Sequence, residues 1–165
     1  MKLTRGAYAT YVDAAMKHVS NGETGRNWYR IGKDIDDMSV DLSPDIETSK
    51  NILDESSAKD NGYEVSVEAD PYYADPADAI YPKLKDIAMN RKKGGDCETT
   101  MLEVIIEDTE ASQHDAWIED VIIKPTSYGG DTSGFHIPFS IYPQGNRKQG
   151  KVTITGGVPT FTATT

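Results

Sequence analysis

The sequence predicts a mainly β fold of the α+β kind: an antiparallel β-sandwich or barrel flanked by one α-helix at about residues 76–91. Several short segments alternate apolar and polar residues, as strands with one buried face do. One segment instead has apolar residues at helical spacing. Turn signals recur about every ten residues in the second half of the chain, which is typical of a sandwich or barrel.

The central segment, residues 62–107, shows strand, helix and strand in succession. Polarity alternates over residues 63–70 and again over 102–106, which predicts two half-buried strands. Between them, Asp75 suits a helix cap and Pro76 a first helical position, where no backbone amide is needed. Gly94 and Gly95 then predict the helix end. The apolar stripe of the predicted helix comprises Ala77, Ile80, Leu84, Ile87 and Ala88.

The N-terminal third is less regular. Residues 7–19 fit either a helical stripe or a strand that ends at Asp13. Residues 28–32 are of β-favouring types, and the alternation of residues 38–42 predicts another strand. Residues 48–61 form a long polar connection with too few apolar residues to bury itself. Two interpretations stay open for it: an exposed arm that becomes ordered on a partner, or a disordered loop.

The C-terminal third is strand-rich. Residues 116–123 predict a long strand that ends at Pro125, and residues 128–131 predict a turn. Residues 135–141 alternate in polarity, but Pro138 cannot donate to a ladder, so this strand is predicted at an edge or at a bulge. Residues 151–155 and 160–162 predict two closing strands around Gly156-Gly157.

Composition indicates one domain, residues 1–165, with the polar arm at about 48–61. The net charge of −10 disfavours binding to nucleic acid or to an anionic membrane. It fits either simple solubility or a surface that stays unattached to a passing polyanion. No apolar run approaches the roughly 20 residues of a membrane span, and the first residues lack the apolar core of a signal peptide. The single cysteine, Cys97, excludes an internal disulfide and fits a reducing compartment.

No residue pattern points to a catalytic, cofactor-binding or metal-binding site, so we predict a protein that is not an enzyme. The three histidines, His18, His114 and His136, are scattered. Residues 34–37 are acidic but lack the later glycine and the closing glutamate of a calcium loop. Residues 129–134 are glycine-rich, yet they contain no lysine and open no helix, as a phosphate-binding loop would.

The order of features resembles that of the major tail (tail tube) proteins of bacteriophages and prophages from Gram-positive bacteria. The resemblance covers nearly the whole chain and matches least in the first twenty residues. The segments that carry it are Trp28-Tyr29-Arg30-Ile31-Gly32-Lys33, Ile46-Glu47-Thr48, Gly62-Tyr63-Glu64-Val65-Ser66, Asp75-Pro76, Lys92-Lys93-Gly94-Gly95-Asp96-Cys97-Glu98-Thr99, Gly150-Lys151-Val152-Thr153 and Thr160-Phe161-Thr162.

The resemblance implies a structural virion protein, made in the host cytoplasm and located in the phage tail. Its partners would be copies of itself, in commonly hexameric rings that stack into a tube, and other tail proteins. DNA would pass through the lumen without specific binding, and no membrane is involved. Residues 48–61 would be the stacking arm. No catalytic residue of the family exists to transfer.

Acidic side chains on the predicted central strands suit such a lumen: Glu64, Glu68, Asp70, Glu103 and Glu107. Two interpretations stay open, because these residues either line the lumen or face the outer solvent. The tube subunit of a phage-derived contractile particle fits the sequence equally. A different class, a monomeric β-sandwich that binds carbohydrate, would need exposed aromatic residues on one face, for which Tyr72-Tyr73 is a candidate. The weakest alternative is an enzyme whose site is not recognisable.

Overall fold

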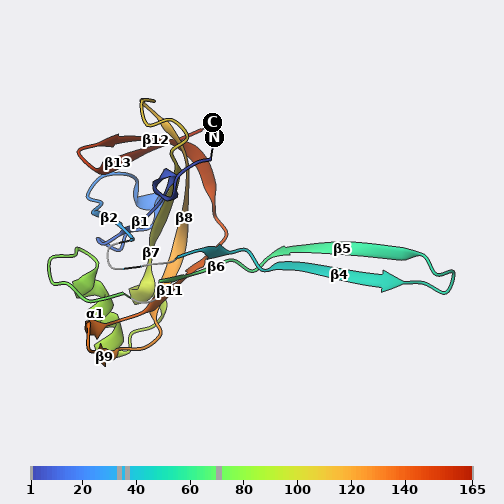
Figure 1. The fold of residues 1–165 in the computed structure, drawn as a ribbon, viewed down its shortest axis with the longest axis horizontal. Coiled ribbons are helices and arrows are strands. Elements are labelled where there is room, and N and C mark those ends of the chain that lie inside the picture. Colours follow the sequence, from blue (N-terminus) through green and yellow to red (C-terminus); the bar gives the residue numbers. More distant parts are fainter. Residues whose placement is uncertain (1, 33–34, 36–37, 70–71, 165) are drawn as a thin grey trace.

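The computed structural model describes residues 2–32, 35, 38–69 and 72–164, and Figure 1 shows that a long hairpin projects from its body. The strands are β1 (Tyr8–Asp13), β2 (Trp28–Arg30), β3 (Val40–Asp41), β4 (Pro44–Lys50), β5 (Ser56–Tyr63), β6 (Ser66–Ala69), β7 (Glu98–Ile105), β8 (His114–Pro125), β9 (Gly129–Asp131), β10 (Gly134–His136), β11 (Phe139–Pro143), β12 (Lys148–Thr155) and β13 (Val158–Ala163). The α-helix is α1 (Tyr81–Asn90), and short 3-10 helices cover Arg5–Ala7, Val19–Asn21 and Gly94–Cys97.

The predicted fold class, mainly β with one α-helix, is confirmed. The main sheet runs in the order β2-β1-β7-β8-β11-β6-β3, and every pair in it is antiparallel. β8 pairs with β7 along one side. On its other side, the first half of β8 pairs with β12 and the second half with β11. This branch gives a curled, half-barrel sheet with β13 beyond β12.

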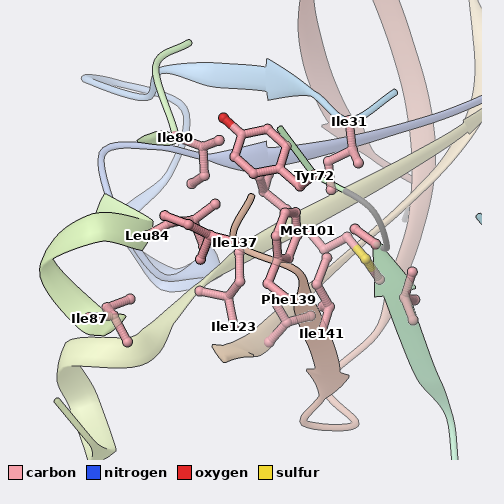
Figure 2. Packing of buried hydrophobic residues seen from close by; sticks show 14 of the residues in the cluster. Ile31, Tyr72, Ile80, Leu84, Ile87, Met101, Ile123, Ile137, Phe139 and Ile141 are labelled. Atoms are coloured by element: carbon pink, nitrogen blue, oxygen red, sulfur yellow. The ribbon is translucent and has the colours of Figure 1, made fainter. Parts of the chain in front are cut away.

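The sheet has a hydrophobic cluster on each of its two faces. Met101 and Leu102 are neighbours in β7 and therefore point to opposite faces. Met101 belongs to the cluster that α1 covers, together with Ile123 and Phe139 (Figure 2). Leu102 belongs to the second cluster, which includes Val152 of β12. β7 is thus buried on both faces from Thr99 to Val104, so the prediction that it is half-buried was wrong.

The helix begins later than predicted, at Tyr81 instead of residue 76. The Asp75 carboxylate accepts a hydrogen bond from the Ala77 amide at 2.9 Å, which closes a turn and not the first helical turn. Pro82 occupies the early position that tolerates a missing amide. The helix ends at Asn90, because Arg91 adopts the left-handed conformation with φ of 50°, before the predicted glycine stop. Of the predicted stripe, Ile80, Leu84 and Ile87 are buried, Ala88 is half-buried and Ala77 is exposed.

The N-terminal segment resolves to the strand alternative, since β1 ends at Asp13. The predicted strand at residues 28–32 is present as the shorter β2. Residues 129–131, predicted as a turn, form β9 and pair with β10 in a small hairpin. Pro138 lies between β10 and β11, and β11 has β8 on one side and β6 on the other. The single strand expected over residues 135–141, at an edge or at a bulge, is thus split at Pro138 into β10, which pairs with β9, and β11. An edge position is wrong for β11, because the proline precedes its ladder instead of interrupting it.

The two predicted closing strands are confirmed as β12 and β13. Gly150 of β12 is opposite Ala163, and a Cβ atom at Gly150 would lie 2.3 Å from the Thr162 carbonyl oxygen. Only glycine permits this close approach. Among the described residues, no helix is long and apolar enough to cross a membrane.

Candidate functional site

The projecting hairpin of β4 and β5, residues 44–63, is called the arm. All of its residues are exposed except Gly62. Glu47 pairs with Lys59 and Thr48 pairs with Ala58. Residues 48–61, which we expected to be either an arm that becomes ordered on a partner or a disordered loop, lie within this exposed hairpin, and its strands are paired within the single chain. Strands were not predicted there because alternation marks a strand with one buried face, and the arm buries neither face.

The turn of the arm is held by Asn51. Its side-chain carbonyl oxygen accepts hydrogen bonds from the amides of Leu53 at 2.9 Å and Glu55 at 3.0 Å. Ile52 and Leu53, together called the tip, are 100% and 73% exposed. Two adjacent aliphatic side chains are therefore exposed in the turn that joins β4 to β5, and Figure 1 shows that this turn is the end of the arm away from the body.

Unpaired backbone runs along both the arm and the main sheet. In the described part of the chain, β4 pairs only with β5, and a lone two-stranded hairpin is marginally stable in water. The main sheet ends at β2, β3 and β13, each with one paired neighbour among the described strands. Open sheet edges of this kind are templates for pairing with another chain. The arm and these edges therefore form the candidate surface for assembly.

A cleft of about 740 Å³ lies at the root of the arm. One wall is apolar and includes Val40, Leu42 and Val65. The floor is polar and consists of Tyr8, Glu103, Glu119 and Arg147, called the floor cluster. Because β1, β7 and β8 are neighbours in the sheet, Tyr8, Glu103 and Glu119 come together although they are far apart in sequence.

Arg147 holds the floor cluster together. Its Nη1 donates to Glu103 Oε1 and to Glu119 Oε1, each at 2.6 Å. The Tyr8 hydroxyl donates to Glu103 Oε2 at 2.6 Å. Two carboxylates that are only 7% and 4% exposed thus share one guanidinium. Burial raises the pKa of Glu119, and burial followed by the nearby Glu103 charge raises the pKa of the Tyr8 hydroxyl.

The acidic residues considered for a lumen differ in their surroundings. Glu64, Glu68 and Glu107 are exposed, which both open interpretations require. Glu103 is buried and shares Arg147 with Glu119, so it lies in the floor cluster and not on an exposed strand face. Asp70 lies outside the described residues.

The histidines and the cysteine have separate surroundings in the structure. His18 pairs with Glu98 at 3.2 Å, His136 stacks edge-on against Tyr73, and Cys97 is buried. No group of three metal-binding side chains occurs among the described residues. Of residues 34–37, only Ile35 lies within the described residues. Tyr72 is buried against Phe139 with ring centroids 5.7 Å apart, so Tyr72-Tyr73 is not an exposed aromatic platform.

The raised pKa of Glu119 gives the protein a pH dependence with a defined sign. The folded state binds a proton at Glu119 more tightly than the unfolded state, so this group stabilises the fold at low pH and loses that contribution as the pH rises above 4.5, its ordinary value. Glu119→Gln removes the effect. We expect its thermal midpoint to rise relative to that of the wild type between about pH 4.5 and neutrality. Thermal denaturation of both proteins across this pH range measures the two midpoints. A difference between the midpoints that stays constant with pH would contradict the prediction.

Neither a scan against protein-family models nor a search of curated proteins gives a match to this chain.

Proposed function

We propose that this protein is the structural subunit of a phage tail tube, self-assembling into rings that stack around a channel for DNA. The single observation that carries the proposal is the arm: a formed β-hairpin, exposed on both faces, with two aliphatic side chains at its tip. An element that buries nothing in its own chain contributes no stability to the monomer. We infer that the arm buries its surface against another molecule in the assembly.

The open edges of the main sheet support the same proposal. Exposed edges are normally a liability, but a cyclic assembly pairs each edge with the next copy and leaves none open. A curled half-barrel sheet suits this role, because copies joined side by side continue its curvature into a closed wall. We expect six copies per ring, as the family resemblance in the sequence implies.

The charge of the chain fits a channel for a polyanion. With a net charge of −10, the subunit as a whole repels a polyanion, and its longest basic run, Arg91-Lys92-Lys93, is only three residues. DNA would then slide past without specific contacts. The subunit would be made in the host cytoplasm and function in the virion tail, with other tail proteins as its neighbours. The tube of a phage-derived contractile particle uses the same geometry and is the closest variant of this proposal.

Sedimentation velocity over a range of concentrations, followed by negative-stain electron microscopy, tests the proposal on the unmodified protein. We expect species of several copies that increase with concentration and appear as rings or tubes. A protein that stays monomeric at every concentration up to the millimolar range would overturn the proposal and favour a binding module. The carbohydrate alternative predicts a monomer that gains thermal stability with oligosaccharides.

A further inference from the structure

The arm carries an exposed apolar surface at each end. At its tip are Ile52 and Leu53. At its root, Leu42 and Tyr63 are exposed and lie in the wall of the cleft. The two surfaces are alike in chemistry but opposite in shape, since the tip protrudes and the root lines a cleft.

The tip cannot reach the cleft of its own chain. β4 leads away from the root to Lys50, and at about 3.3 Å per residue the tip lies roughly 27 Å from Pro44. The arm is extended along this whole length (Figure 1). Any contact between tip and cleft is therefore a contact between two molecules.

We propose that the tip of one copy docks into the cleft of a second copy, with the Lys50 ammonium facing the floor cluster. This inference rests on the proposed function and names the surfaces that join one subunit to the next. Ile52 and Leu53 then cover the apolar wall formed by Val40, Leu42 and Val65.

Charge complementarity selects the arm tip as the occupant. The floor cluster has two carboxylates and one guanidinium, hence one negative charge in excess. Lys50 is the basic residue next to the tip, and its ion pair with Asp54 at 3.1 Å is exposed. Exposed pairs contribute little, so Lys50 can exchange this partner at small cost. Burial raises the pKa of Glu119, and a cation at the floor would offset part of the cost of keeping this carboxylate charged there.

The contact is heterologous, because each copy offers one tip and one cleft on different surfaces. Repeated head to tail, such contacts produce rings or open filaments. Two buried aliphatic side chains do not by themselves offset the free-energy cost of association. We therefore expect tip docking to act together with pairing of the sheet edges.

Disulfide trapping in the full-length protein tests the contact. In a Cys97→Ala background, one variant carries Leu53→Cys and a second carries Leu42→Cys. Mixed under mild oxidation, they should form a cross-linked heterodimer at least tenfold faster than Leu53→Cys mixed with Met89→Cys. Met89 is a matched control, since it is exposed on α1 and outside the cleft.

The charge arrangement is tested in the same assay. Lys50→Met and Glu119→Gln should each slow the cross-link about fivefold, and together no more than either alone, because they remove one interaction. If Leu53→Cys cross-links to Leu42→Cys no faster than to the Met89→Cys control, the docking proposal is overturned. If the wild type still forms rings or tubes in that case, the proposed function stands and only the docking fails. A wild type that never assembles refutes the proposed function instead.

Discussion

Replacing residues 48–58 with Asn-Gly is expected to abolish ring and tube formation while leaving the domain folded. Glu47 and Lys59 are directly opposite each other in the arm, so a two-residue turn closes the shortened hairpin in register. All removed residues are exposed, so the free energy of unfolding should change by less than about 1 kcal/mol. The deletion removes both the tip and most of the unpaired backbone of β4 and β5, which we propose as assembly surfaces.

Sedimentation velocity and thermal denaturation, measured on the same sample, separate the two effects. The matched control is Ser49→Thr/Ser57→Thr, which keeps the arm length and tip and retains hydroxyl groups at this cross-strand pair. The control should assemble as the wild type does. Tubes from the shortened protein in normal yield would remove the arm from the assembly mechanism. A large loss of thermal stability would show instead that the arm supports the monomer.

The elements that could be predicted from the sequence are those with one buried side. The stripe of α1 was found because Ile80, Leu84 and Ile87 face the core while the residues between them are more exposed. Val67 and Ala69 of β6 were found by the same logic at period two. In these segments a single interface dictates the pattern, so the pattern identifies the element.

Segments with two similar faces gave weaker signals. β7 is buried on both faces, so Glu103 was interpreted as a surface residue although it lies in the floor cluster. The arm is exposed on both faces, so its strands were not predicted. The cleft requires Glu103, Glu119 and Arg147 to meet across three segments, and no local spacing indicates that contact. One feature of the sequence could have indicated an ion pair there: Arg147 is a basic residue in a predicted turn of a chain with an excess of acidic residues.

Arg147→Met is expected to destabilise the fold by about 2–3 kcal/mol at neutral pH. Removing one partner of a buried ion pair costs about 3–5 kcal/mol, and the value is lower here because the Arg147 side chain is partly exposed. The substitution leaves Glu103 and Glu119 as two buried carboxylates without their shared cation. It also removes the guanidinium from the face of Trp117, 5.7 Å from the ring centroid.

The double variant Arg147→Met/Glu119→Gln identifies the cause. If uncompensated charge is responsible, the second substitution should recover at least half of the lost stability, because one carboxylate no longer has to be charged in the core. Acidification should likewise narrow the stability difference between Arg147→Met and the wild type, because Glu119, whose pKa is raised by burial, takes up a proton. Lys148→Met is the control for loss of a neighbouring, exposed charge, and it should change stability by less than about 0.5 kcal/mol. Urea denaturation of the four proteins measures these effects. An Arg147→Met loss that Glu119→Gln leaves unchanged would mean that arginine packing, and not charge, holds the floor cluster together.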